Sequence, residues 1–366
     1  MRPVNHQIRL AARPSGLPKA SDWMLTAEPA PKAGTGEVVV AVEYLSIDPA
    51  MRRWISSKPG DSGTVPIGAV MEAGAIGQVT ASAHPGFQVG EHVYGAFGVQ
   101  EFASSNATEV TKLDTSLAPL TAYLGALGVT GLTAYFGLLD VGRLSAGETV
   151  VVSGAGGAVG SVAGQIAKIK GARVIGIASG SQKTRWIVEQ LGFDAAIDYK
   201  ADDVGRALGE LVPDGVDVFL DNVGGETLEA VIGHLARGAR IVLSGGVSQY
   251  NTEQPSGPSN YIELIRKRAS MIGFLTPDYA DRYPDARAEL ADWLRDGRLI
   301  SREQIIDGGI RAFPDALLKL FAGENIGKLV LAASPQPLDE GSDPGNGSNA
   351  ARPSPGAGST SGPRWS

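Results

Sequence analysis

The sequence predicts an α/β protein built from two parts, a β-rich part and a doubly wound parallel sheet. With 366 residues, 43% of them hydrophobic, the chain is long enough for two domains of ordinary size, each with its own core. Up to about residue 128, short apolar and β-branched runs are separated by Gly and Pro. From Thr149 the pattern changes to a repeat of strand, glycine turn and helix, which is typical of a parallel sheet.

Strands are predicted where short apolar runs are bounded by turn residues. In the first part these runs are Glu37 to Tyr44, Gly77 to Thr80 and His92 to Gly95. In the second part they are Thr149 to Ser153, Arg173 to Ala178, Val216 to Asp221 and Arg240 to Ser244, with a short one at Ala195 to Asp198.

Helices between the strands are indicated by apolar residues at helical spacing. The first helix has Val159, Val162, Ala163, Ile166 and Ala167 on one face. The second begins after Ser181 and stops at Gly192, so both helices have recognisable ends.

The last third of the chain changes pattern twice. Near Gly297 to Ile310 the alternation ends, and a helix from Phe313 to Phe321 leads through Gly323 to a strand, Lys328 to Ala332, that could rejoin the first part. After Ala333 the composition falls to Pro, Gly, Ser, Asn and Asp, which leaves too little apolar surface to offset ordering entropy. We therefore expect residues 334–366 to be a disordered tail.

Composition excludes several classes of function. The net charge is −7 and no run of Lys and Arg occurs, so a nucleic-acid partner is disfavoured. No apolar stretch is long enough for a membrane span or a secretory signal, and we expect a cytoplasmic protein without a membrane partner. The chain has no cysteine, and its four histidines, His6, His84, His92 and His234, lack partners at metal-ligand spacing. We therefore predict no metal site.

The strongest functional signal is the segment TVVVSGAGGAVGSVAGQIAKIKG, residues 149–171. It reads as a buried strand, a glycine-rich turn and an amphipathic helix. Ala155, Gly157 and Gly160 stand at the three positions of the GxGxxG pattern, which keep the turn tight and let the backbone approach a pyrophosphate. The helix N-terminus would add free N–H groups, so we predict a Rossmann dinucleotide-binding domain rather than a purely structural glycine turn.

The choice between NAD and NADP is read at the end of the second strand. NAD-binding chains place an Asp or Glu there for the ribose hydroxyl, but here no carboxylate occurs before Glu189. Ser179, Lys183 and Arg185 instead offer a hydroxyl and two cations to a 2′-phosphate, which favours NADP. The alternative for Lys183 is a solvated side chain, although a cation is unfavourable in the first turn of a helix.

Two further strand ends carry candidate ligands. Asn222 follows the strand that ends at Asp221, at the edge of the sheet where open α/β folds bind ligands, although Asn is also common in turns. The segment Ser244 to Asn251 ends the next strand. Its small residues would let the backbone pass close to a nicotinamide, and Tyr250 adds a phenol, either for chemistry or for loop packing.

Taken together, these motifs resemble the zinc-independent medium-chain dehydrogenase/reductases, specifically the NADPH-dependent double-bond reductases that include prostaglandin, alkenal and curcumin reductases. The resemblance covers residues 7 to about 332. It rests on YLSIDPAMR (44–52), GLTAYFGLLD (131–140), GAVGSVAGQIAKIKG (157–171), LGFDAAIDYK (191–200), DNVGGE (221–226), SQYN (248–251) and GENIGK (323–328). The absence of cysteine agrees with this branch, because zinc-dependent members of the fold need cysteine ligands.

The resemblance implies a GroES-like β-rich catalytic domain, residues 1–128 and 301–333, with a Rossmann domain, 129–300, inserted between its two stretches. It implies pyrophosphate contacts at the glycine turn, adenosine contacts near Lys183 and Tyr199, and nicotinamide contacts toward Asn325. A homodimer is also expected. The cofactor-binding residues predicted for NADPH are Gly157, Ala158, Val159, Gly160, Ser179, Lys183, Tyr199, Asn222, Ser244, Gly245, Gly246, Phe274, Leu275 and Asn325, with Tyr250 as the catalytic residue.

The chain departs from the family pattern at two places. Ala50 stands where many members have a Tyr that lines the substrate cleft, and Val129-Thr130 replaces the usual Met-Pro. The substrate preference of relatives therefore does not transfer directly.

The predicted reaction is reduction of an α,β-unsaturated aldehyde or ketone. Without a Lewis-acid metal, a conjugated enone is a better hydride acceptor than a simple ketone, because charge passes to oxygen as an enolate. NADPH would deliver the hydride to the β-carbon, Tyr250 or the cofactor ribose would stabilise the enolate, and Tyr250 or solvent would protonate the α-carbon. The alternatives are quinone reduction on the same scaffold and a non-catalytic NADPH-binding or redox-sensing protein.

Overall fold

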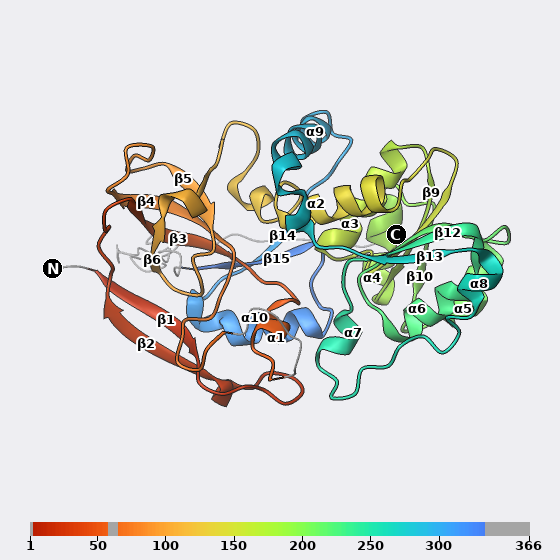
Figure 1. The fold of residues 1–366 in the computed structure, drawn as a ribbon, viewed down its shortest axis with the longest axis horizontal. Coiled ribbons are helices and arrows are strands. Elements are labelled where there is room, and N and C mark those ends of the chain that lie inside the picture. Colours follow the sequence, from red (N-terminus) through yellow and green to blue (C-terminus); the bar gives the residue numbers. More distant parts are fainter. Residues whose placement is uncertain (1–2, 58–64, 334–366) are drawn as a thin grey trace, which may run out of the picture. The chain divides into compact units, whose positions relative to one another are not determined.

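A computed structural model describes residues 3–57 and 65–333 of the chain. The tail expected at 334–366 lies outside the described residues. Within the described part the chain forms one parallel sheet, one larger mixed sheet and a separate two-stranded sheet (Figure 1).

The parallel sheet has six strands in the order β10-β9-β8-β11-β12-β13. All five pairings are parallel. In chain order the sheet starts in the middle and is built outward in both directions, which is the doubly wound arrangement of a Rossmann fold. The strands are β8 (Thr149–Ser153), β9 (Arg173–Ala178), β10 (Ala195–Asp198), β11 (Val216–Asp221), β12 (Leu235–Leu243) and β13 (Ser270–Gly273).

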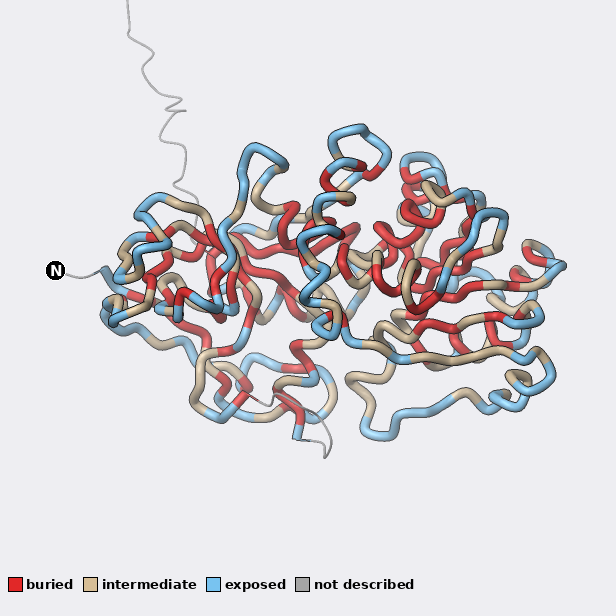
Figure 2. Tube along the Cα trace, turned by 45° about the horizontal axis from the view of Figure 1, so that its top comes forward, coloured by how far each residue is buried: buried red, intermediate tan, exposed pale blue. Residues whose placement is uncertain are grey.

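Helices cover both faces of this sheet, because successive residues of a buried strand point to opposite sides. Val150 and Val152 of β8 belong to the core that contains α2, α3, α4 and α9, whereas Val151 belongs to the core that contains α5 and α6. Figure 2 shows that the strands are buried along most of their length. The helices are α2 (Val129–Phe136), α3 (Ala158–Ile169), α4 (Gly180–Glu189), α5 (Val204–Leu211), α6 (Gly225–Ile232), α7 (Val247–Tyr250), α8 (Glu263–Lys267) and α9 (Tyr283–Arg295).

The mixed sheet is β-rich and combines both ends of the described chain. Its path is β14-β15-β3-β4-β5-β7, with β6 paired to β3. β15 runs antiparallel to β3, so the strand that comes last in the described chain lies beside one of the first, as Figure 1 shows in blue and orange. The strands are β3 (Glu37–Ser46), β4 (Ala75–Ser82), β5 (His92–Gly95), β6 (Phe102–Asn106), β7 (Thr111–Lys112), β14 (Glu303–Ile306) and β15 (Lys328–Ala332). The short helix α1 (Met51–Trp54) follows β3, and α10 (Phe313–Phe321) precedes β15.

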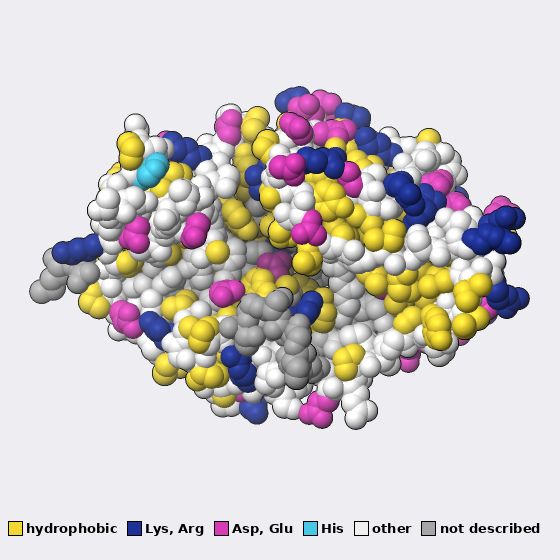
Figure 3. Space-filling view, viewed as in Figure 1, with side chains coloured by type: hydrophobic (Ala, Val, Ile, Leu, Met, Phe, Trp, Pro, Cys, Tyr) yellow, Lys and Arg dark blue, Asp and Glu magenta, His cyan; other side chains and the backbone are white. Residues whose placement is uncertain are grey.

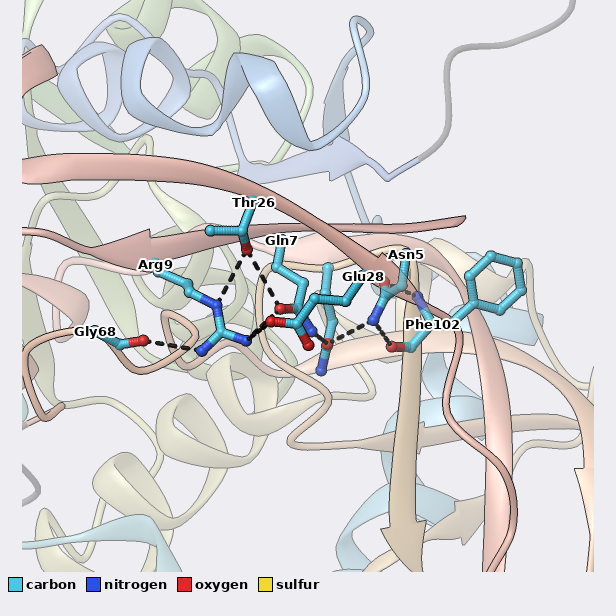
Figure 4. Close-up of polar contacts among 8 residues, drawn as sticks. Asn5, Gln7, Arg9, Thr26, Glu28, Gly68 and Phe102 are labelled. Atoms are coloured by element: carbon cyan, nitrogen blue, oxygen red, sulfur yellow. Dashed lines mark hydrogen bonds and ion pairs between the residues drawn. The ribbon is translucent and has the colours of Figure 1, made fainter. Parts of the chain in front are cut away.

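The two-stranded sheet, β1 (Val4–Leu10) and β2 (Trp23–Pro29), is held to the β-rich part by polar contacts (Figure 4). Asn5 Nδ2 donates to the carbonyl of Phe102 at 2.8 Å. Arg9 donates to the carbonyl of Gly68 at 2.9 Å and forms an ion pair with Glu28 at 2.9 Å. This ion pair joins β1 to β2, and because both side chains are partly exposed to water, it contributes little free energy.

Most predicted elements are confirmed, although several have other bounds. The strands predicted at Glu37 to Tyr44 and Gly77 to Thr80 are longer, and span Glu37–Ser46 and Ala75–Ser82. The strand predicted from Arg240 begins at Leu235, because the pairing of β11 with β12 continues across an irregularity around Gly238, where φ is +81°. The helix expected to begin after Ser181 and to end at Gly192 spans Gly180 to Glu189 instead. Gly192 has φ +74° and belongs to the turn that follows.

Among the helices of the described residues, none is long and apolar enough to cross a membrane.

Candidate active site

A cavity of about 930 Å³ lies between the parallel sheet and the β-rich sheet. Its walls come from both parts of the chain, including Asp48, Tyr94 and Lys328 on one side and Gly157, Asn222 and Tyr250 on the other. The space-filling view shows a hollowed region between the two parts with hydrophobic side chains gathered around it (Figure 3).

The carboxyl ends of the parallel strands bring most of the predicted site residues together here. Ligands of open α/β sheets bind at this edge, where the strand order reverses between β8 and β11. Twelve of the predicted residues line the cavity: Gly157, Ala158, Val159, Gly160, Ser179, Lys183, Tyr199, Asn222, Ser244, Gly245, Tyr250 and Asn325.

The glycine turn after β8 and the start of α3 have no room for a side chain at Gly160 and little at Gly156. A Cβ on Gly160 would lie 2.4 Å from the carbonyl oxygen of Gly154, and one on Gly156 would lie 2.9 Å from the Lys183 side chain. Gly157 is the N-cap of α3, and no side chain caps this helix end. The turn therefore leaves N–H groups of the first helical turn open toward the cavity, as phosphate binding requires.

Asp221 organises the turn after β11. Its buried carboxylate accepts hydrogen bonds from Ser153 Oγ at 2.6 Å and from the backbone N–H groups of Val223 and Gly224. Burial raises the pKa of the Asp221 carboxyl, while these hydrogen bonds oppose that shift. Asn222 donates from Nδ2 to the Ser153 carbonyl at 2.7 Å and accepts from Ser244 Oγ at 2.6 Å. Its amide therefore ties together the ends of three neighbouring strands beside the cavity.

Lys183 reaches across from α4 to the β-rich part of the chain. Its Nζ donates to the carbonyl of Gly323 at 2.7 Å. Burial, followed by the nearby charge of Lys200, lowers the pKa of Lys183 to about 8. The side chain is thus not a solvated surface lysine. Arg185, in contrast, does not line the cavity and donates to the carbonyl of Ser181 in its own helix.

Tyr250 ends the short helix α7 with its phenol beside the backbone that follows β12. The phenol oxygen accepts the N–H of Gly246 at 3.1 Å. An oxygen that accepts in this way keeps its own hydrogen for another partner, so the Tyr250 hydroxyl is available as a donor to a ligand.

Three predicted residues line a neighbouring cavity rather than the main one. Gly246, Phe274 and Leu275 border a space of about 480 Å³ that shares Ser244, Gly245 and Tyr250 with the main cavity. Phe274 packs edge-on against Tyr279, with ring centroids 6.3 Å apart.

Sequence reasoning identified little of the opposite wall, which comes from the β-rich part. Asp48 there accepts a hydrogen bond from buried Lys328 at 2.8 Å, and Tyr94 of β5 faces the same space. Ala50 and Thr130, which were noted only as departures from the family pattern, also line it. The short run HVYG around Tyr94 contains no signal that distinguishes a site residue from a packing residue.

These residues fit the dinucleotide NADPH that the glycine pattern predicts. A Cβ on Gly160 would collide with the Gly154 carbonyl oxygen, so the turn stays tight, and α3 offers an uncapped N-terminus to a pyrophosphate. Lys183 supplies a cation beside Ser179 for a further phosphate. Both features line the same cavity.

The side chains that the structure describes are poorly suited to binding a metal ion. The chain contains no cysteine. Across residues 3–57 and 65–333, no three acidic or histidine side chains are grouped so that they could hold a metal ion.

Comparison with known proteins decides the family. Residues 6–113 match the model described as the N-terminal domain of oxidoreductase, and residues 158–293 match the one described as zinc-binding dehydrogenase. The chain is 39% identical to the NADPH-dependent curcumin reductase of Escherichia coli (strain K12), over 89% of this chain and 96% of that protein. The chain belongs to the zinc-independent medium-chain dehydrogenase/reductase family.

Other members of this family place it in the branch of double-bond reductases. It is 37% identical to the NADP⁺-dependent 2-alkenal reductase of Nicotiana tabacum, over 90% of this chain and 98% of that protein. The crystal structure of CurA in complex with NADPH from Vibrio vulnificus superposes with a TM-score of 0.85 at 41% identity, covering 91% of this chain and all of that one. The family resemblance predicted from the sequence motifs is thus confirmed.

Substitution of Gly160 by Ala tests the glycine turn. The added Cβ would meet the Gly154 carbonyl oxygen at 2.4 Å, so the turn must open and its N–H groups move away from a bound pyrophosphate. We expect the Kd for NADPH, measured by fluorescence titration, to rise about tenfold or more.

The control is Gly257→Ala, where nothing lies within 4 Å of the added Cβ. Gly257→Ala should bind like the unchanged protein. Wild-type affinity in a folded Gly160→Ala variant would show that the pyrophosphate binds elsewhere.

Proposed function

We propose that this protein reduces the conjugated carbon–carbon double bond of α,β-unsaturated aldehydes or ketones, with NADPH as the cofactor. The observation that carries the proposal is the Tyr250 phenol, which lines the cavity that the glycine turn also borders and keeps its hydrogen free to donate. The named activities of the curcumin reductase and 2-alkenal reductase relatives support this class of reaction.

NADPH would be held along the carboxyl edge of the parallel sheet. The backbone of Gly157 to Gly160 would meet the pyrophosphate, and Lys183 with Ser179 would meet the 2′-phosphate. Asn325 and the backbone of Ser244 and Gly245 would border the nicotinamide. When bound there, the cofactor supplies a hydride for the β-carbon of the conjugated acceptor.

Residues of the chain stabilise the charge that develops on the substrate oxygen. The Tyr250 hydroxyl donates a hydrogen bond to that oxygen, while the Gly246 N–H holds the phenol oxygen in place. Tyr250 or a solvent molecule then protonates the α-carbon of the enolate. The cavity walls at Trp54, Leu124 and Val129 are apolar, which displaces water from the double bond and strengthens the hydrogen bond at the oxygen.

A direct assay of the purified chain tests the proposal. The chain would be mixed with NADPH or NADH and a panel of enals, enones and quinones, and the near-ultraviolet absorbance of the reduced nicotinamide would be followed. We expect NADPH to be consumed with enals and enones, and the product mass to be that of the saturated carbonyl compound. Consumption with quinones alone would replace the proposed reaction by quinone reduction. NADPH binding without oxidation by any acceptor would favour a non-catalytic protein.

The pH dependence of cofactor binding tests Lys183. Because burial lowers its pKa to about 8, the amine of the free protein loses its charge as the pH rises through that value. A neutral amine attracts a 2′-phosphate only weakly, so we expect NADPH affinity to fall from about pH 8 upward, by up to tenfold per pH unit. NADH, which lacks this phosphate, should show no such change.

Two variants serve as controls for this titration. Lys183→Met should abolish the difference between the two cofactors. Lys200→Met removes the neighbouring cation that lowers the Lys183 pKa, so the fall should begin at a higher pH. Identical pH profiles for NADPH and NADH in the unchanged protein would contradict the role given to Lys183.

Tyr250→Phe tests the proposed donor. Loss of one hydrogen bond to a developing oxyanion lowers turnover by about a hundredfold or more, whereas NADPH affinity should change less than about twofold. The matched control is Tyr261→Phe, because Tyr261 is 59% exposed and does not line the cavity. Steady-state kinetics and cofactor titration of both variants give the comparison. Unchanged turnover in Tyr250→Phe would remove this phenol from the reaction.

A further inference from the structure

Tyr94 places a second phenol in the cavity, on the wall opposite the parallel sheet. It lies in β5, between buried Val93 and buried Gly95, and its half-buried side chain lines the same cavity as Tyr250. The residues proposed to hold NADPH come mainly from the strand ends of the parallel sheet. A phenol on the β-rich wall therefore faces the substrate part of the cavity.

Gly74 is what allows the Tyr94 phenol to take this position. A Cβ on Gly74 would lie 2.9 Å from the Tyr94 hydroxyl oxygen and 3.4 to 3.5 Å from two ring atoms. The φ of Gly74 is not in the left-handed region, so the backbone itself does not demand glycine there. Glycine is needed at position 74 because the Tyr94 phenol fills the space that a side chain there would occupy.

The hydroxyl of Tyr94 differs from those of Tyr123 and Tyr135 in its hydrogen bonding. Tyr123 donates to the Asp114 carbonyl at 2.7 Å, and Tyr135 donates to Glu289 at 2.6 Å. For the Tyr94 hydroxyl, no partner exists among residues 3–57 and 65–333. The hydroxyl therefore opens into the cavity, where it can donate to a bound molecule.

Burial is the main reason that the Tyr94 phenol stays protonated. Burial, followed by the charge of Asp48, raises the pKa of Tyr94 to about 12. Asp48 accepts from Lys328 at 2.8 Å and also from Ser46. Arg287 opposes the shift, but its Nε donates to the Leu127 carbonyl at 3.1 Å and its guanidinium lies over the ring of Tyr283. The phenol is therefore a donor throughout the neutral range.

We propose that Tyr94 is a specificity-determining residue whose hydroxyl donates a hydrogen bond to a second oxygen of the substrate, on the arm beyond the reacting double bond. This inference deepens the proposed function and rests on it. The site then prefers conjugated ketones or aldehydes that carry a further acceptor oxygen, such as ene-diones, over acceptors with a single carbonyl. Ala50, whose methyl group lines the same wall, leaves the space that such an arm needs.

The test compares a matched pair of substrates, a linear hexenone and the hexenedione of the same carbon skeleton, in the full-length protein with NADPH. Tyr94→Phe removes only the hydroxyl. Because a neutral hydrogen bond contributes modestly, we expect kcat/KM for the hexenedione to fall about threefold to tenfold, and kcat/KM for the hexenone to change less than about twofold. The Kd for NADPH should stay the same in both cases.

A second variant protects the test against a folding defect. Gly74→Ala keeps the hydroxyl but displaces it, since the new methyl group would lie 2.9 Å from the phenol oxygen. Gly74→Ala should lower kcat/KM for the hexenedione selectively, as Tyr94→Phe does. The melting temperature of Tyr94→Phe should be unchanged, which checks that this variant folds. Equal losses on both substrates, or no loss on either, would overturn the assignment of Tyr94 while leaving the reaction intact. No reduction of either substrate by the unchanged protein would overturn both the reaction and the assignment.

Discussion

The site depends on one backbone contact between the two parts of the chain. The N–H of Gly327 donates to the carbonyl of Gly156 at 2.8 Å, and a bridge joins Gly157 to Gly327. The next residue, Lys328, is buried and bonds to Ile47 and Asp48 in the β-rich part. The glycine turn that would receive a pyrophosphate is thereby fixed directly to the opposite wall. A side chain at position 327 would lie 2.2 Å from the Arg302 carbonyl oxygen, so only glycine fits at this position.

Local signals were sufficient to predict five of the six strands of the parallel sheet. β8, β9 and β11 occur at the predicted residues, because strands buried on both faces appear in the sequence as continuous apolar runs bounded by turns. The edge strand β13 (Ser270–Gly273) was not predicted, since three of its residues are only partly buried, Gly273 is exposed, and no continuous apolar run occurs there. The first strand, β1, was missed for a related reason. Its sequence, VNHQIRL, mixes polar and apolar residues, and its position depends on distant contacts such as that of Asn5 with Phe102.

The candidate site was predictable on one side only. Parallel strands end at the same edge, so residues that follow those strands, such as Asn222 and Ser244, could be grouped from the sequence. Lys183 carried a further signal, because a cation in the first turn of a helix is unfavourable without a ligand or acceptor. The opposite wall is assembled by antiparallel pairings between segments far apart in the chain. Tyr94 reaches the cavity only because Gly74 makes room for it, and no local pattern encodes that relation.

The pairing of β15 with β3 also has a consequence for the order in which the protein is made on the ribosome. A growing chain presents β3 early, yet one of its partner strands is synthesised only after the whole parallel sheet has emerged. Domains generally fold as units during synthesis, so the parallel sheet can form while residues Tyr44 to Ser46 of β3 still lack their partner β15. Asn325 and Lys328 arrive with β15, and the cavity is complete only then. A nascent chain therefore acquires its nucleotide-binding half before it acquires a closed substrate site.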